Sequence, residues 1–134
     1  MRIDEFLKLT GGKAVSRRKP RHIESGIQQS CVRWFRMVYP QFIILSIPNG
    51  GSRNAIEAAN LKREGALAGA SDLVVIAFRR ILFVEMKRPS GRQQATQKAF
   101  QERVEALGFK YVICRSLEEF ISSVDEWLKT ERFV

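Results

Sequence analysis

The chain has 134 residues, 45% of them hydrophobic, and a formal net charge of +9. This length favours one globular domain with a single core, and the positive charge suits a nucleic acid or an anionic membrane surface as partner. No apolar run approaches the ~20 residues that span a bilayer, the first residues lack the apolar segment of a signal peptide, and one histidine with two cysteines is too few for a zinc finger.

The N-terminal region combines a short amphipathic piece, Ile3–Leu9, with a cluster of basic residues. The cluster contains Arg17, Arg18, Lys19 and Arg21. We therefore predict that residues 1–20 form a loosely ordered basic arm and that residues 21–134 form the domain. Such an arm could follow DNA phosphates, although a solvated terminus is the more common outcome.

Helical spacing of apolar residues predicts the first long helix, over residues 21–38. Its apolar positions are Ile23, Ile27, Cys31, Trp34, Phe35 and Val38. Glu24 and Gln28 lie four residues apart on one edge of this stripe, so their side chains could point together into a site. The plain alternative is that Glu24 is an ordinary acid of the first turn, where the helix dipole favours negative charge.

A strand is predicted over Phe42–Ile47, and because it is apolar throughout we expect it to be buried. The loop at residues 48–53 contains two glycines that let backbone amides approach an anion, with Arg53 beside them. A helix over Asn54–Glu64 follows and ends in a glycine in the left-handed conformation. Lys62, near the end of this helix, either suits the helix dipole, contacts DNA, or does both.

The middle of the chain holds two short apolar runs, Leu73–Phe78 and Ile81–Met86, which are rich in Val, Ile and Phe. This composition favours a buried β-hairpin over a helix. Arg79-Arg80 are the predicted loop residues, although Gly, Asn or Asp is preferred in a two-residue turn.

The hairpin register decides whether three charged side chains meet. With that loop, Asp72 faces Lys87, and Glu85 lies opposite Val74. Side chains alternate between the faces of a strand, so Asp72, Glu85 and Lys87 project from one face at the open end of the hairpin. A four-residue loop preserves this pairing, whereas a three-residue loop would turn Asp72 to the other face.

Two carboxylates and an ammonium at the end of apolar strands are costly to bury unless something compensates them. A hard divalent cation would do so, because Mg²⁺ prefers oxygen ligands and completes its shell with water and substrate phosphate. A structural ion pair of Asp72 with Lys87, with Glu85 solvated, explains the hairpin equally well.

Two further helices and a strand complete the predicted fold. The elements are a helix over Gln93–Leu107, a strand over Phe109–Cys114, and a last helix opened by a capping box at Ser116 and Glu119. The first of these helices is expected to turn Ala99, Phe100, Val104 and Leu107 inward. Gln97 lies one turn before this apolar stripe, where a polar residue is on its own usually solvated. We interpret Cys31 and Cys114 as buried thiols.

Several of these pieces together resemble the VRR-NUC (virus-type replication–repair nuclease) family, a branch of the PD-(D/E)XK nucleases. They are Glu24, Gln28, the Pro48-Asn49-Gly50-Gly51 loop, Lys62, Gly65, Gly69, Asp72, the run VEMKRP at 84–89, Gln97 and Phe100. The resemblance covers residues 21–115 and is strongest to small stand-alone phage and bacterial members. The D…E-x-K pattern alone is weak, since short charged patterns recur by chance, but the ordered combination is specific.

The resemblance implies a restriction-endonuclease-like α/β fold, with a central mixed sheet of about four strands flanked by helices. It also implies that Asp72, Glu85 and the Met86 carbonyl hold Mg²⁺, for which Mn²⁺ would substitute. Lys87 would position the attacking water, and Glu24 would be an accessory carboxylate that binds the metal directly or through water. Gln97 would face the same site.

Partners and location follow from the same resemblance. We expect cleavage of branched DNA such as Holliday junctions by a homodimer in the cytoplasm of a bacterium or phage-infected host, without a membrane. The expected DNA contacts are Arg17, Arg18, Arg53, Lys62, Arg88 and Arg92. The competing hypotheses are a non-catalytic basic DNA-binding module and a related nuclease acting on RNA or single-stranded ends.

Overall fold

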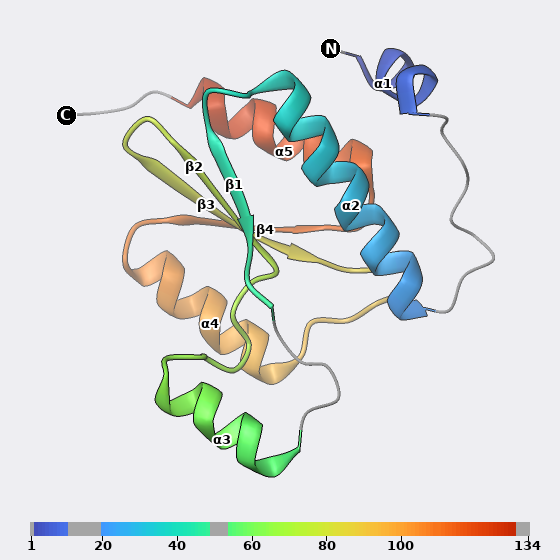
Figure 1. Ribbon diagram of the computed structural model, residues 1–134. Coiled ribbons are helices and arrows are strands. Elements are labelled where there is room, and N and C mark those ends of the chain that lie inside the picture. Colours follow the sequence, from blue (N-terminus) through green and yellow to red (C-terminus); the bar gives the residue numbers. More distant parts are fainter. Residues whose placement is uncertain (1, 11–19, 49–53, 131–134) are drawn as a thin grey trace.

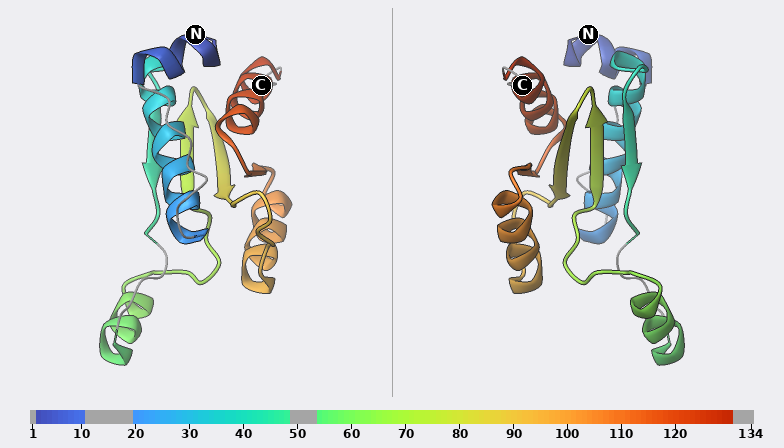
Figure 2. Two further views of the ribbon diagram at one scale, coloured as in Figure 1. Left: turned by 90° about the vertical axis from the view of Figure 1, so that its right-hand side faces the viewer. Right: turned by 90° about the vertical axis from the view of Figure 1, so that its left-hand side faces the viewer.

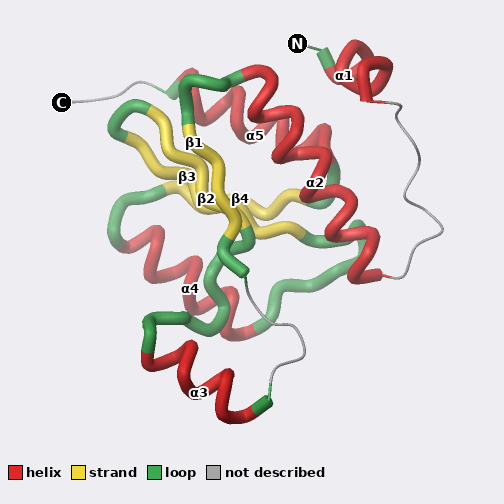
Figure 3. Tube along the Cα trace, viewed as in Figure 1, coloured by secondary structure: helices red, strands yellow, loops and turns green. Residues whose placement is uncertain are grey.

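The computed structural model describes residues 2–10, 20–48 and 54–130, which contain both helices and strands (Figure 1). The helices are α1 (Ile3–Thr10), α2 (Pro20–Val38), α3 (Ala55–Arg63), α4 (Ala95–Ala106) and α5 (Leu117–Lys129). The strands are β1 (Ile43–Ser46), β2 (Leu73–Ala77), β3 (Arg80–Met86) and β4 (Lys110–Cys114). Figure 3 shows the strands gathered at the centre with helices around them.

The four strands form one mixed sheet in the order β1-β2-β3-β4. The first two pairs are antiparallel, and β3 runs parallel to β4. Parallel neighbours need a crossover connection, and α4 supplies it between β3 and β4. The predicted α/β class with four mixed strands flanked by helices is confirmed.

Helices α2 and α5 pack together on one face of the sheet and enclose the core. The fully buried core side chains include Cys31, Trp34, Phe35, Leu73, Val75, Leu82, Val84, Met86, Cys114, Phe120 and Val124. Trp34 contacts Phe120 edge-on, with ring centroids 5.9 Å apart. Cys31 and Cys114 are free buried thiols, as predicted.

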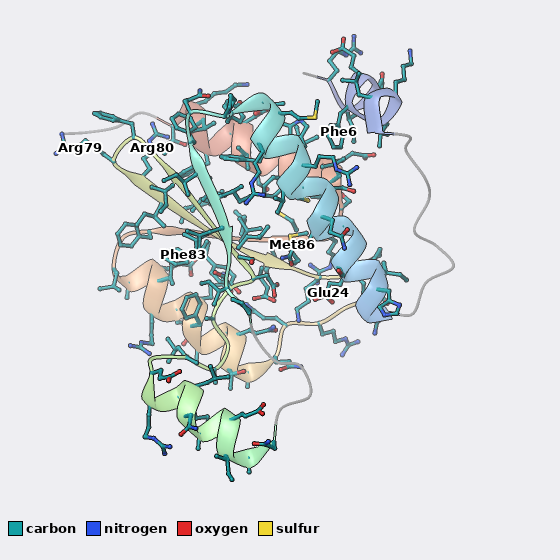
Figure 4. The ribbon with its side chains drawn as sticks, in the orientation of Figure 1. Phe6, Glu24, Arg79, Arg80, Phe83 and Met86 are labelled. Atoms are coloured by element: carbon teal, nitrogen blue, oxygen red, sulfur yellow. The ribbon has the colours of Figure 1, made fainter. Side chains whose placement is uncertain are left out.

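The amphipathic piece predicted at Ile3–Leu9 is a helix that is anchored to this core through one side chain. Phe6 is only 1% exposed and belongs to the core cluster (Figure 4). Burial of this completeness contributes about 1.5–3 kcal/mol for a phenylalanine. The basic cluster that follows lies within residues 11–19 and at Arg21, outside the side chains that the structure describes.

The opposite face of the sheet is only partly covered. Phe100 of α4 contacts Phe83 of β3 edge-on, with ring centroids 5.7 Å apart. Among the described residues, none covers β1 on this face, and Ile43 and Leu45 are 55% and 40% exposed. The prediction of a buried strand over Phe42–Ile47 is therefore wrong: β1 is an edge strand that buries only Ile44 under the helices. An unbroken apolar run cannot reveal that one face of its strand stays open.

The predicted hairpin is present, but its register is different. Ala77 pairs with Arg80, so the turn is Phe78-Arg79 and not Arg79-Arg80. Arg79 adopts φ 59°, which is uncommon for a residue with a side chain. Continuing the ladder past Leu73 and Val84 puts Asp72 opposite Glu85, whereas we predicted that it faces Lys87.

This shift of two residues preserves the alternation of side chains. Asp72, Glu85 and Lys87 still project from one face of the sheet, as predicted. They lie beside Met86 at the open end of the hairpin, and Figure 4 shows Met86 at the opposite end from the turn residue Arg79.

Two helices differ in detail from the sequence prediction. Helix α4 buries only Val104 fully, and Leu107, expected to point inward, is 75% exposed. Helix α3 has no buried residue and projects from the body at the same end as the charged cluster (Figure 2). The glycine cap after α3 is confirmed, since Gly65 has φ 116°.

None of the described helices is long and apolar enough to cross a membrane.

Candidate active site at the open end of the hairpin

Asp72 is fixed by backbone groups of both neighbouring strands. Its Oδ2 accepts a hydrogen bond of 2.7 Å from the Met86 N–H on β3. Its carbonyl accepts one of 2.8 Å from the Ile47 N–H, directly after β1. These bonds hold the carboxylate at the end of the sheet, beside Glu85.

Glu85 is a buried acid, 1% exposed, whose two oxygens both have partners. Its Oε2 accepts a hydrogen bond of 2.9 Å from Gln97 Nε2 on α4. Its Oε1 accepts one of 3.3 Å from Tyr111 Oη on β4. Lys87 Nζ lies 3.9 Å from Oε2, close enough to pair with Glu85 when this acid is ionised. Elements far apart in the sequence therefore meet at this one carboxyl group.

The carboxylates of Asp72 and Glu85 repel each other when both are charged, because little water surrounds them. Burial raises the pKa of Glu85, and the neighbouring Asp72 carboxylate raises it further, from 4.5 to about 8. The positive charge of Lys87 lowers this pKa but does not cancel the rise. Without a further cation, Glu85 is therefore protonated near neutral pH and shares a hydrogen bond with Asp72. A pair of carboxyl groups in this state suits a divalent cation, which can replace the proton.

Helix α4 is held close to this pair by a glycine. A Cβ at Gly69 would lie 2.2 Å from the backbone oxygen of Thr96, and Gly69 has φ 82°, so only glycine fits. This contact sets the start of α4, where Gln97 Oε1 accepts a hydrogen bond of 2.8 Å from the Gln94 N–H. The same side chain donates from Nε2 to Glu85, so the helix cap and the site share one residue.

A family model of the VRR-NUC domain matches residues 15–118. The chain belongs to the VRR-NUC family. A solved VRR_NUC domain protein has the same fold, with a TM-score of 0.68 and 24% sequence identity over 84% of this chain and 93% of the other. No curated protein matches the chain in sequence. The restriction-endonuclease-like fold is thereby confirmed, and the family implies a nuclease-type function.

Glu24 lies on the first turns of α2, near the Met86 end of β3 (Figure 4). Burial raises the pKa of its carboxyl group above 4.5, Lys87 opposes this shift, and Asp72 adds to it. Glu24 also accepts a hydrogen bond from the Arg88 backbone. It thus belongs to the surroundings of the charged cluster in this VRR-NUC domain and is more than a solvated acid of the first turn.

The described side chains do not form a metal site from protein groups alone. Within residues 2–10, 20–48 and 54–130, no three His, Cys, Asp or Glu side chains lie close enough together to hold an ion. Asp72 and Glu85 form a pair, and Glu24 stands apart with the Arg88 backbone. A metal in this VRR-NUC domain would need further oxygen ligands from backbone, water or substrate, as Mg²⁺ usually does.

The expected DNA contacts fall into two groups. Arg92 and Lys62 are exposed, and Arg88 is half-buried with its Nη1 donating to Ser90 Oγ at 2.6 Å. Arg17, Arg18 and Arg53 lie outside the described residues. Of the described side chains, Arg88 is the one next to Lys87 in the chain.

Sequence reasoning missed two residues of this region. Tyr111 contacts Glu85 directly, and burial raises the pKa of its hydroxyl, which therefore keeps its proton. Arg115 Nη2 donates to the Gly91 carbonyl at 2.9 Å and so holds the loop that follows Lys87. The only signal for Tyr111 was a hydroxyl within the largely apolar strand β4.

Proposed function

We propose that this VRR-NUC domain is a Mg²⁺-dependent endonuclease that hydrolyses phosphodiester bonds of branched DNA. The observation that supports it most is the pairing of the buried Glu85 with the half-buried Asp72, with Lys87 Nζ 3.9 Å from Glu85. A purely structural ion pair needs one acid and one base. The second acid raises the cost of burial and is accounted for by a cation that binds between the two.

Asp72, Glu85 and the Met86 carbonyl would hold the metal, with Glu24 contributing directly or through water. Mg²⁺ suits these oxygen ligands, and Mn²⁺ would substitute. When bound, the metal would supply Lewis acidity and neutralise negative charge at the scissile phosphate. Met86 is suited to its part because its N–H already fixes Asp72.

The protein's own side chains have separate roles. The Lys87 ammonium positions and polarises the attacking water and faces the negative phosphate. Gln97 holds Glu85 through its amide and stays anchored to the start of α4 through its oxygen. Glu85 thus keeps its orientation towards the metal through turnover.

The basic side chains support binding of DNA by its backbone. Arg88 follows Lys87 directly in the chain and Arg92 comes four residues after Arg88, so we expect phosphates near the site to meet more than one positive side chain. Contacts of this kind fix the position of DNA without reading its bases. We therefore expect selectivity for DNA structure and little selectivity for sequence.

A homodimer fits the open face of the sheet. Ile43 and Leu45 are exposed apolar side chains on β1, which is an edge strand of the sheet, and Phe78 at the hairpin turn is also exposed. An edge strand with an apolar face is prone to pair with another chain. A two-fold dimer through this surface would bring two sites to two DNA strands.

The dimer proposal predicts that charge on β1 yields monomers. The double change Ile43→Lys and Leu45→Lys should halve the mass measured by analytical ultracentrifugation. Ile56→Lys on the exposed helix α3 is the control and should leave the mass unchanged. If the double variant remained a dimer, the proposed dimer interface on β1 would be wrong.

The nuclease proposal is tested with labelled four-way junctions, linear duplex, single-stranded DNA and RNA, each with Mg²⁺, Mn²⁺ or a chelator. We expect metal-dependent cuts in the junction and little cutting of the other substrates. Binding without cleavage in every metal would favour the non-catalytic DNA-binding module. Preferential cutting of RNA or single-stranded ends would favour the related nuclease.

A further inference from the structure

Tyr111 lies on β4 at a position from which its side chain reaches Glu85. Phe83 pairs with Tyr111 and Glu85 pairs with Ile113, so Tyr111 is the diagonal neighbour of Glu85 on the same face of the sheet. A long side chain can span such a diagonal. Tyr111 is 4% exposed, and this position directs its hydroxyl into the buried end of the site.

The Tyr111 hydroxyl is held in place from two sides. Its ring packs against Phe100 of α4, with centroids 6.3 Å apart. Its Oη accepts a hydrogen bond of 3.5 Å from Gln93 Nε2, and that amide also donates to Gln101 Oε1 at 2.8 Å. The hydroxyl therefore approaches Glu85 Oε1 from a fixed point.

Both carboxyl oxygens of Glu85 therefore accept hydrogen bonds, each from a different element. Gln97 on α4 donates to Oε2 and Tyr111 on β4 donates to Oε1. A carboxylate with a donor on each oxygen has little freedom to rotate about its last bond. Partners of this kind commonly determine how well a metal ligand is oriented.

We propose that Tyr111 is a positioning residue, whose hydroxyl orients Glu85 for a divalent cation. This inference rests on the proposed metal-dependent function. The amide of Gln93 supports it in turn by fixing the hydroxyl. Replacing the hydroxyl by hydrogen should therefore weaken metal binding without changing the fold.

The chain offers a matched pair of variants, Tyr111→Phe and Tyr39→Phe, because it has two tyrosines. Tyr39 Oη also donates to a carboxylate, Asp125 Oδ1, at 2.7 Å, but it comes from the end of α2 remote from Glu24. Each variant loses one hydroxyl and keeps its ring. Mn²⁺ binding to the whole chain without DNA is measured by isothermal titration calorimetry, and the thermal unfolding midpoint is measured without metal.

Tyr111→Phe should raise the Mn²⁺ dissociation constant by about tenfold, the lower end of the range for lost partners of metal ligands. Tyr39→Phe should leave this constant unchanged, although it should lower the unfolding midpoint at least as much. Gln93→Leu should give a smaller rise than Tyr111→Phe. In cleavage assays, Tyr111→Phe should need more Mg²⁺ for half its maximal rate and recover most of that rate at saturation.

The outcomes separate this inference from the proposed function. If the wild type binds Mn²⁺ and Tyr111→Phe binds it equally well, the positioning role is wrong and the nuclease proposal stands. If the wild type binds no Mn²⁺, both are wrong. If Tyr111→Phe is unfolded, Gln93→Leu decides, and an unchanged dissociation constant would overturn the inference.

Discussion

The two ends of the β2–β3 hairpin carry charge in different ways. At the turn, Arg80 donates to the carbonyls of Trp127 and Thr130 and lies over the Trp127 ring, 5.9 Å from its centroid. At the open end, Asp72 and Glu85 face each other, and Lys87 lies against only one of them. The turn end also holds two grooves of about 500 and 460 Å³.

This difference shows which kind of charge indicates function. The Arg80 guanidinium completes the C-terminal end of α5, where a helix favours a cation, so its role is structural. Two acids held together at the other end cost stability, and proteins keep such arrangements where chemistry needs them. The volumes of the grooves alone would place the functional site at the turn end. The free-energy cost of burying acidic groups places it at the open end.

The largest effect on cleavage is expected at Lys87, and Lys110 at the other end of the hairpin provides the comparison. Lys87→Met should lower the cleavage rate by about 10²–10⁴-fold, because the attacking water loses its positioning cation. DNA affinity, measured by fluorescence anisotropy, should change little, since the other basic side chains remain. Lys110→Met in the groove at the turn end is the control and should cut at the wild-type rate. Equal losses in the two variants would remove the distinction between the ends.

Stability without metal should depend on pH through Glu85. Its pKa is about 8 in the folded protein and near 4.5 when unfolded, so between these values the folded state binds more protons. The free energy of unfolding should therefore fall as pH rises through this window, and level off above it. Urea unfolding across the window measures this slope.

Glu85→Gln is the control for that slope, because its amide does not titrate. It should flatten the dependence on pH. Mn²⁺ added above the window should restore stability to the wild type and not to the variant. A wild type whose stability rises with pH across the window would contradict the raised pKa of Glu85 beside Asp72.

A third comparison uses two glycines with positive φ. Gly69→Ala places a Cβ 2.2 Å from the Thr96 carbonyl oxygen and should cost about 3 kcal/mol or more. Gly65→Ala meets nothing within 4 Å and should cost about 1–2 kcal/mol through backbone strain alone. Urea denaturation gives both values. Similar costs would mean that Gly69 does not fix the start of α4.

The smallest effect is expected at the turn. Arg80→Met loses the hydrogen bonds to the end of α5 and should lower the free energy of unfolding by about 1–2 kcal/mol. Its cleavage rate, measured well below the unfolding midpoint, should equal that of the wild type. A clear loss of activity in the folded variant would show that the turn end also serves the reaction.

The sequence predicted the elements of this fold and the residues of the site more closely than their contacts. Apolar spacing located α2, the hairpin and α5, because each has a one-sided or unbroken apolar pattern. The common face of Asp72, Glu85 and Lys87 was also predicted, since alternation along strands survives a shift of two residues. The predicted pairing of Asp72 with Lys87 was wrong because the turn forms at Phe78-Arg79. Arg79 adopts a left-handed backbone conformation there, which the sequence of the turn does not favour.

Whether a side chain is exposed, and which partner it contacts, depends on segments that are distant in the sequence. No local sequence pattern carries this information. β1 and the end of α4 are apolar, yet Ile43, Leu45 and Leu107 are exposed because no described element covers them. Gln97 was expected to face the site, and its amide does donate to Glu85 there, but the sequence around Gln97 does not specify this partner. Tyr111 reaches Glu85 only through the parallel pairing of β4 with β3, a contact between distant segments.

The most direct measurement of the central claim is the anomalous diffraction of crystals soaked in Mn²⁺. We expect a peak between the carboxylates of Asp72 and Glu85, and we expect it to be absent from crystals of the Glu85→Gln variant. No peak there in the wild type, or an equally strong peak in the variant, would contradict a metal site at the open end of the hairpin.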